Sequence, residues 1–320
     1  MSHLTRRSMR SVDPVMLEQR ALALSQRSIK AEAKERGLRL AVSMIDLTTL
    51  EGADTPEKVR GLCRKAIDPL PGSESLLGEC VPSVAAVCVF PSMVTVARDA
   101  LEGSSVKVAS VATGFPSGQY PLDVRLRDTQ AAIDAGADEI DMVINRSAFL
   151  AGRIDEMCDE IRAVLMQCES SSRDVHLKII LETGELGSYR AIRYAADCAI
   201  DAATSASTRL RSQDGGIFIK TSTGKISSAA TLPVTLVMLE AIRDHFRATG
   251  NRIGIKPAGG IRTAKQALQY LVLVKETLGD AWLQPHLFRI GASSLLNDIL
   301  RQLMKTRHGS YASIDDFADV

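Results

Sequence analysis

Two lysines stand where predicted buried strands end, and they give this chain its clearest capacity for chemistry. Lys220 follows the apolar run IFI, and Lys256 ends the run RIGI. Burial and a nearby like charge both lower the pKa of a lysine. A lysine that is neutral near pH 7 is a nucleophile able to form a Schiff base with a carbonyl. The alternative is that Lys220 and Lys225 are surface lysines flanking a turn, which fits Lys225 better than Lys220.

Acidic residues on predicted strands supply partners for this positive charge. In the segment 139–145, EIDMVIN, the alternation of a strand puts Asp141 on the face opposite its three apolar neighbours. Both faces of a buried strand are covered, so Asp141 needs a partner. We interpret it as an acid/base group, with a structural ion pair as the alternative. Lys178 adds another interior charge, and Asp46 either offsets this positive field or holds a substrate hydroxyl.

Glycine and serine follow the last two predicted strands in a pattern that favours an anion. Gly259 and Gly260 allow backbone to approach a ligand closely, and Gly291, Ser293 and Ser294 lead into the last predicted helix. The GK at the end of FIKTSTGK resembles part of a nucleotide-binding loop, but the full GxxxxGK[ST] pattern fails. These turns therefore predict a site for a small phosphorylated compound.

The elements that must position these residues alternate along the chain. Short β-rich runs are predicted at 40–47, 84–90, 106–112, 139–145, 175–181, 217–220, 252–256 and 287–290. Helical patterns follow them at 56–67, 93–101, 123–135, 154–167, 189–202, 231–247, 264–278 and 294–304. Eight such units predict a single (β/α)₈ TIM barrel, in which functional residues lie at the carboxyl ends of the strands. A doubly wound open sheet is the alternative, although nothing limits such a sheet to eight strands.

Two segments fall outside the eight units. Residues 14–36 predict a polar amphipathic helix ended by Gly37 and packed over the amino-terminal side of the barrel. Residues 68–82, rich in proline and glycine, predict an excursion before the second strand. We therefore divide the chain into an N-terminal helical extension (1–37), the barrel (38–306) and a C-terminal tail (307–320).

Composition excludes several classes of function. Lys plus Arg number 39 against 38 acidic residues, so the net charge of +1 argues against non-specific nucleic-acid binding. The six cysteines form no CxxC pair, and the five histidines form no HxH or HExxH. This favours reduced thiols in a cytoplasmic protein without a metal site. Prolines and serines interrupt the longest uncharged run, 80–97, so we expect no membrane span. No step of the predicted chemistry requires a cofactor.

Several segments in order resemble the deoxyribose-phosphate aldolase family, in its animal-type form. They are DLTTL (46–50), AAVCVFP (85–91), VATGFPSG (111–118), GADEIDMVIN (136–145), ETGELG (182–187), FIKTSTGK (218–225), GIKPAGGIRT (254–263) and RIGASSLL (289–296). FIKTSTGK and KPAGG together are close to diagnostic of the family. The resemblance implies a class I aldolase that cleaves 2-deoxy-D-ribose 5-phosphate to acetaldehyde and D-glyceraldehyde 3-phosphate, in deoxyribonucleoside catabolism.

The resemblance also implies roles for single residues. Lys220 would form the Schiff base, Lys256 would depress its pKa and relay protons, and Asp141 would be the acid/base partner. The substrate would be held by Asp46, Thr223, Gly224, Lys225, Gly259, Gly260, Arg262, Gly291, Ser293 and Ser294. Cys88 matches a cysteine near the active site of some relatives, and core packing is our preferred interpretation. Relatives often end in a tyrosine that reaches the site, whereas here Tyr311 lies nine residues before the end.

Three alternatives to this function stay open at this stage. A Schiff-base aldolase for another phosphorylated sugar would carry the same lysines. A non-catalytic relative would bind a sugar phosphate or a protein, and residues 1–36 could add a scaffold role. We expect a homo-oligomer, dimer or tetramer, as is common in such relatives. The sequence determines neither the preferred direction of the reaction nor the order of proton transfers.

Overall fold

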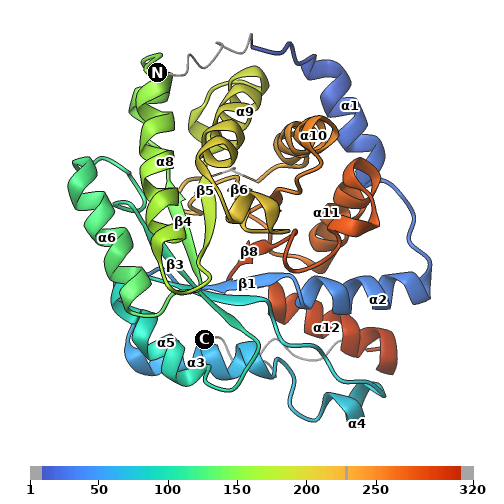
Figure 1. Cartoon of the computed structure of the whole chain (residues 1–320). Helices are drawn as coiled ribbons and strands as arrows, with labels where there is room; N and C mark the ends of the chain where they lie inside the picture. Colours follow the sequence, from blue (N-terminus) through green and yellow to red (C-terminus); the bar gives the residue numbers. More distant parts are fainter. Residues whose placement is uncertain (1–8, 228–229, 311–320) are drawn as a thin grey trace.

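Eight parallel strands form one sheet that curls into a barrel, surrounded by helices (Figure 1). The computed structural model describes residues 9–227 and 230–310. The strand order is β7-β6-β5-β4-β3-β2-β1-β8, and neighbouring strands in this order pair in parallel. Bridges between Ile255 and Phe288 and between Ala258 and Gly291 join β7 to β8. The predicted (β/α)₈ barrel is therefore confirmed, and the open sheet was the wrong alternative.

The observed elements follow the predicted order. The strands are β1 Ile45–Thr48, β2 Ala86–Val89, β3 Lys107–Ala112, β4 Glu139–Val143, β5 His176–Ile180, β6 Ile217–Lys220, β7 Gly254–Lys256 and β8 Ile290–Ala292. The helices that follow them are α3 Pro56–Ile67, α5 Val94–Ala100, α6 Leu122–Asp134, α8 Ile154–Ser170, α9 Tyr189–Ala206, α10 Leu232–Thr249, α11 Ala264–Leu278 and α12 Leu295–His308. Two short helices, α4 Ser73–Leu77 and α7 Arg146–Leu150, lie in the connections.

The predicted first and last strands are wrong in their bounds. Residues 40–42 belong to helix α2, Ala31–Val42, and the strand begins only at Ile45. The apolar run there is the buried face of a helix followed directly by a buried strand, which periodicity over a short window does not separate. The last strand is shifted towards Ala292, because Phe288 makes only an isolated bridge to β7.

The N-terminal extension also differs from the prediction. It forms two helices, α1 Pro14–Ser25 and α2, and Gly37 lies inside α2 instead of ending a helix. A Cβ at Gly37 would lie 2.8 Å from Leu268 Cδ2, so the glycine permits close approach to α11. The helices pack on the outer layer and not over the amino-terminal side: α1 contacts α10 and α11, and α2 contacts α11 and α12 (Figure 1). The division into three segments stays a prediction.

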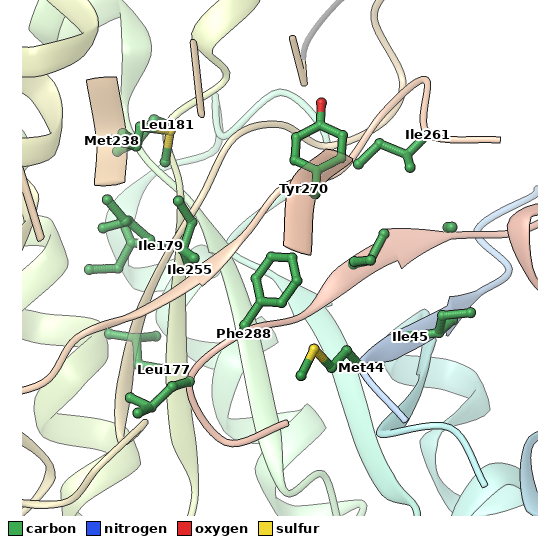
Figure 2. Close-up of a cluster of buried hydrophobic side chains, with 14 of the residues drawn as sticks. Met44, Ile45, Leu177, Ile179, Leu181, Met238, Ile255, Ile261, Tyr270 and Phe288 are labelled. Carbon is green, nitrogen blue, oxygen red and sulfur yellow. The ribbon is translucent and has the colours of Figure 1, made fainter. Parts of the chain in front are cut away.

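The strands separate an apolar outer layer from a largely polar interior. Outward-facing side chains such as Ile179, Ile255 and Phe288 are buried against the helices (Figure 2). Inside the barrel, a small apolar cluster gathers on β2 and β3, around Cys88 and Val111. Because each fully buried aliphatic or aromatic side chain stabilises the fold by about 1.5–3 kcal/mol, the outer layer is able to hold charged groups at the centre.

Candidate active site

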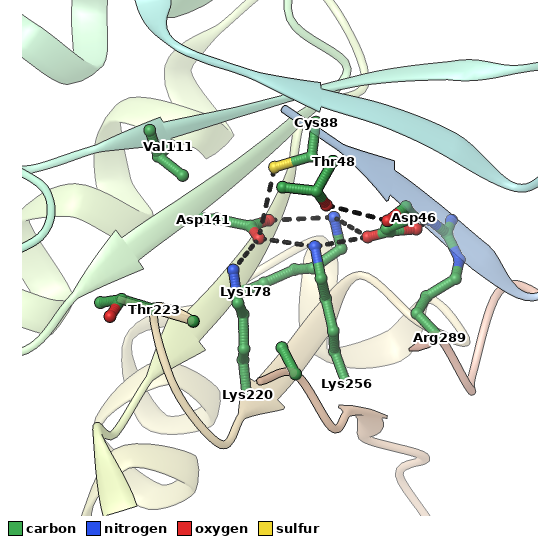
Figure 3. Close-up of polar contacts among 12 residues, drawn as sticks. Asp46, Thr48, Cys88, Val111, Asp141, Lys178, Lys220, Thr223, Lys256 and Arg289 are labelled. Carbon is green, nitrogen blue, oxygen red and sulfur yellow. Dashed lines mark hydrogen bonds and ion pairs between the residues drawn. The ribbon is translucent and has the colours of Figure 1, made fainter. Parts of the chain in front are cut away.

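Asp141 is the centre of the barrel's polar interior. Its Oδ2 accepts hydrogen bonds from Lys220 Nζ and Lys256 Nζ, each at 2.7 Å, and its Oδ1 accepts one from Lys178 Nζ at 3.1 Å (Figure 3). β4, β5, β6 and β7 are consecutive in the sheet, and their registers place Asp141 opposite Lys178 and Lys220 opposite Lys256. The two lysines therefore lie close together, as predicted, and Asp141 has the partners that its burial requires.

A second set of contacts lies beside this centre. Asp46 Oδ1 accepts a hydrogen bond from Arg289 Nη1 at 2.6 Å, and Asp46 Oδ2 lies 2.6 Å from Lys256 Nζ. The latter contact is an ion pair by distance but lacks hydrogen-bond geometry, and Oδ2 has no hydrogen-bond partner among the described residues. Glu139 accepts hydrogen bonds from Arg289 and Lys178. Asp46 thus offsets positive charge, as predicted.

The charges of this network do not balance when every group is ionised. It joins four cationic side chains to three carboxylates, all of them buried: Lys178, Lys220, Lys256 and Arg289 with Asp46, Glu139 and Asp141. An uncompensated buried charge is costly, and a lysine relieves that cost by releasing its proton. One neutral lysine would bring the network to balance.

Lys220 is the lysine whose environment favours the neutral form. Burial lowers its pKa below the usual 10.5; Asp141 opposes this effect, and the positive charge of Lys256 adds to it. Burial alone would also lower the pKa of Lys256, but the carboxylates of Asp141 and Asp46 raise it well above its usual value. Despite its own burial, Asp141 is held well below its usual pKa by the three lysines. Burial and like charge alone predict a lowered pKa for both lysines. In the structure the pKa of Lys220 is lowered, whereas that of Lys256 is raised.

A cavity of about 170 Å³ opens above the two lysines at the carboxyl ends of the strands. Its lining includes Lys220 and Lys256 together with nine of the predicted binding residues: Thr223, Gly224, Lys225, Gly259, Gly260, Arg262, Gly291, Ser293 and Ser294. Asp141 and Asp46 are not in the lining and lie beneath it, in contact with the lysines. Residues far apart in the chain therefore form one pocket around the candidate nucleophile.

The rim of this cavity combines several features that favour an anion. Gly259 and Gly260 have φ of 95° and 85°, which other residues rarely adopt. Ser294 is the N-cap of α12, a 14-residue helix, and its side chain makes no capping bond. A helix N-terminus with cationic side chains nearby, here Lys225 and Arg262, suits a phosphate group.

Sequence reasoning missed two carboxylates around this rim. Glu51 lines the cavity and pairs with Lys225, with Oε1 3.0 Å from Nζ. Glu182, in the left-handed conformation at φ 55°, accepts the Thr223 hydroxyl at 2.5 Å and the Thr223 backbone N–H at 3.3 Å. Burial raises the pKa of Glu182. Glu182 is the first residue of the ETGELG segment and follows the predicted strand 175–181. A charged residue directly after an apolar strand could have identified it from the sequence.

Arg289 and Glu139 were also missed as members of the network. Both are ionisable residues within or next to apolar strands, which is the criterion that selected Asp141. Cys88, by contrast, both packs in the interior cluster and lies against the network, with its Sγ 4.0 Å from Asp141 Oδ2. Burial raises the pKa of its thiol, so the thiolate is disfavoured. Core packing therefore accounts for Cys88, at a place that borders the site.

Other sequence predictions concern features outside this site. All six cysteines are free thiols. Within residues 9–227 and 230–310, no group of three or more His, Cys, Asp or Glu side chains could hold a metal ion, and no helix is long and apolar enough to cross a membrane. Tyr311 and the rest of the chain after 310 lie outside the described residues.

Gly291 provides a first test of how tightly this site is packed. A Cβ added there would lie 2.7 Å from Ala258 Cβ and 3.1 Å from Lys256 Cε. We expect Gly291→Ala to displace Lys256, to lower kcat/KM by about 10–100-fold, and to lower the free energy of unfolding by about 1–3 kcal/mol. Steady-state kinetics and urea denaturation measure both. Gly52→Ala is the matched control, since nothing lies within 4 Å of its Cβ position. Unchanged kinetics in Gly291→Ala would contradict this packing.

A parallel barrel with buried lysines and a carboxylate beneath a cavity at the carboxyl ends of its strands has the architecture of a barrel aldolase. Comparison with known proteins agrees with that class. The model of the DeoC/LacD aldolase family matches residues 40–301, and the chain belongs to this family. It is 48% identical over 297 residues to the mouse protein named deoxyribose-phosphate aldolase, covering 91% of this chain and 88% of the relative. The human protein of that name is 46% identical over 310 residues, covering 95% and 92%.

Solved structures support the fold. A protein from Toxoplasma gondii ME49 superposes with a TM-score of 0.67 at 22% identity, covering 90% of this chain and 100% of that one. The tetrameric deoxyribose phosphate aldolase from Aeropyrum pernix superposes with a TM-score of 0.60 at 24% identity, covering 91% and 99%. The identities to the mouse and human proteins confirm the resemblance to the animal-type form.

Proposed function

We propose that this aldolase reversibly cleaves 2-deoxy-D-ribose 5-phosphate to D-glyceraldehyde 3-phosphate and acetaldehyde, through a Schiff base on Lys220. One observation carries the proposal: Lys220 Nζ and Lys256 Nζ donate to the same oxygen of Asp141, directly beneath a cavity whose rim favours an anion. This arrangement supports one neutral and one charged lysine at the same carbonyl. The mouse and human relatives carry the name of this activity.

Cleavage begins with the Lys220 amine. Its lone pair attacks C1 of the open-chain sugar, and loss of water leaves an iminium ion that acts as an electron sink. Lys256 keeps its proton and supplies the positive charge beside the developing Schiff base. The rim at Gly259, Gly260 and Ser293 would hold the phosphate and so fix the position of C1 relative to the Lys220 amine.

The carbon–carbon bond breaks in the next step. Asp141, with Lys256 and a water molecule, takes the proton of the C3 hydroxyl, and the C2–C3 bonding electrons move to the iminium nitrogen. D-Glyceraldehyde 3-phosphate leaves, and an enamine remains on Lys220. A proton then returns to C2, and hydrolysis frees acetaldehyde and the amine. Asp46 lies beneath the cavity and pairs with Lys256, so it helps to keep that lysine charged.

Reductive trapping tests the covalent intermediate. The protein is incubated with acetaldehyde and borohydride, and the adduct is mapped by mass spectrometry. We expect one reduced ethyl adduct, on Lys220. The absence of an adduct in folded protein would contradict the Schiff-base mechanism and favour the non-catalytic alternative. A panel of phosphorylated sugars then separates this substrate from that of another Schiff-base aldolase.

The pH dependence should follow the charge of Lys220. Its pKa lies below the usual value, so free amine appears, and activity rises, as pH increases through that lowered pKa. Lys256→Met removes a positive charge that helps to lower it, while Asp141 remains. We therefore expect the acid limb of kcat/KM to move to higher pH and activity at pH 7 to fall about 100-fold.

Lys225→Met is the matched lysine control for that measurement. Its Nζ pairs with Glu51 at the rim, away from the Asp141 centre. We expect a higher KM for the phosphorylated sugar and an acid limb that stays in place. An unshifted limb in Lys256→Met would show that Lys256 does not set the charge of Lys220.

We also propose a cytoplasmic homo-oligomer that acts in deoxyribonucleoside catabolism. The free thiols support a reducing compartment, and the relative from Aeropyrum pernix has a tetrameric structure. Light scattering coupled to size-exclusion chromatography measures the assembly, and a monomer would contradict the proposed homo-oligomer.

A further inference from the structure

Arg289 and Glu139 form a buried ion pair that the proposed mechanism does not use. Arg289 Nη2 donates to Glu139 Oε1 at 2.7 Å, and Arg289 Nη1 lies 3.2 Å from Oε2. Neither residue lines the cavity above the lysines. Both line a separate cavity of about 330 Å³ formed by residues at the amino ends of the strands, such as Lys107 and His176. The pair therefore lies below the lysines, on the side away from the substrate.

Two routes of direct contact lead from this pair to Asp141. On one side, Glu139 accepts a hydrogen bond from Lys178 Nζ, and that same Nζ donates to Asp141 Oδ1 at 3.1 Å. On the other, Arg289 holds Asp46 Oδ1 at 2.6 Å while Asp46 Oδ2 faces Lys256 Nζ at 2.6 Å (Figure 3). Lys178 thereby occupies one oxygen of Asp141 and leaves the other to Lys220 and Lys256.

We propose that Arg289 and Glu139 are positioning residues, which hold Lys178 and Asp46 so that Asp141 turns Oδ1 to Lys178 and Oδ2 to the lysine pair. This inference rests on the proposed function of Lys220. A buried ion pair adds little stability compared with apolar residues of similar volume. Stability alone therefore gives a weak reason for placing an arginine and a glutamate inside the barrel, whereas orientation of the catalytic carboxylate gives a specific one.

Charged and titratable groups reach the surroundings of Lys220 from most strands of the barrel. They are Asp46 on β1, Cys88 on β2, Asp141 and Glu139 on β4, Lys178 on β5, Lys256 on β7 and Arg289 just before β8, while β3 contributes the apolar Val111. Removing a negative charge from this set disfavours the protonated form of Lys220. Removing a positive charge favours the protonated form.

The two single variants should therefore shift the pH profile in opposite directions. In Glu139→Gln, the amide still accepts a hydrogen bond but the charge is lost, so the acid limb of kcat/KM should move to lower pH. In Arg289→Met, the acid limb should move to higher pH. We expect shifts of about half a pH unit or more. Because both variants disturb Asp141, kcat should fall about 10–100-fold while KM stays close to that of the unaltered protein.

The double variant Glu139→Gln/Arg289→Met and the conservative Arg289→Lys complete the experiment. The double variant removes one charge of each sign, so its midpoint should lie between those of the single variants. Arg289→Lys retains the charge, so its midpoint should stay near that of the unaltered protein. If Arg289→Met does not fold, the shift to lower pH in Glu139→Gln against the unshifted Arg289→Lys still tests the proposal. Arg252→Met is the matched control, because this half-exposed arginine pairs with Asp214 and should not move the midpoint.

Adduct formation on Lys220 is measured in every variant, so that two failures can be told apart. Shifts in the same direction, or no shift, in folded variants that still form the adduct would overturn the positioning role and leave the proposed function intact. An unaltered protein without an adduct on Lys220 would overturn both. A purely structural pair would lower the melting temperature without shifts of opposite sign.

Discussion

Lys220→Ala should abolish cleavage, lowering kcat by roughly 10⁴-fold or more, because the nucleophile that forms the electron sink is gone. The Lys220 side chain is 3% exposed, and its Nζ donates to Asp141 Oδ2 at 2.7 Å. The environment of Lys220 favours the neutral form, so its loss leaves three cationic side chains facing three carboxylates and the charges stay balanced. We therefore expect the fold to persist, with circular dichroism close to that of the unaltered protein.

Three measurements test the effect of Lys220→Ala. The first is steady-state cleavage of 2-deoxy-D-ribose 5-phosphate, and the second is borohydride trapping, in which Lys220→Ala should yield no adduct. The third is thermal unfolding, which checks that lost activity is not lost structure. Lys225→Met should still form the adduct, because its target lysine is intact. Retained turnover in folded Lys220→Ala would refute the assignment of the nucleophile.

Asp141→Asn should lose both activity and stability. The substitution keeps the shape of the side chain and removes the charge that faces three lysines. We expect kcat to fall about 10²–10⁴-fold, since general acid–base assistance is lost. We expect the free energy of unfolding at pH 7 to fall by about 3–5 kcal/mol, the usual cost of removing one partner from a buried ion pair.

The pH dependence of that stability loss has a definite sign. The folded protein holds the pKa of Asp141 well below the usual 3.8, because the lysines outweigh its burial. Its carboxylate therefore stabilises the fold fully above pH 3.8, and this contribution is lost as pH falls through the lower folded pKa. The difference between the two proteins in urea denaturation should be largest at neutral pH and shrink below pH 3.8.

Glu160→Gln is the matched control for this variant. Glu160 accepts a hydrogen bond from buried Arg125 at 2.8 Å, between α6 and α8 on the outside of the barrel. We expect this variant to lose stability and keep its turnover number. A normal turnover number in Asp141→Asn would remove Asp141 from the chemistry.

Local patterns in the sequence determined the order of the elements and the main site residues. Strands and helices differ in the period of their apolar residues, so eight alternating units could be recognised from short windows. Lys220, Lys256 and Asp141 stood out because a charged residue in or at the end of an apolar strand has to be compensated. The same windows failed at residues 40–42, where the end of a helix and the start of a strand are both buried.

Only the tertiary structure decided how the charges are shared. Lys256 and Asp141 are 115 residues apart and Arg289 and Asp46 are 243 apart, yet each pair is in direct contact. Lys220 pairs with one carboxylate, Asp141, whereas Lys256 pairs with both Asp141 and Asp46, so only Lys220 has the lowered pKa. The register of the strands around the closed barrel sets these contacts. Sequence periodicity predicts which face a residue occupies, whereas long-range contacts such as Glu182 with Thr223 and Glu139 with Arg289 arise only when the barrel closes.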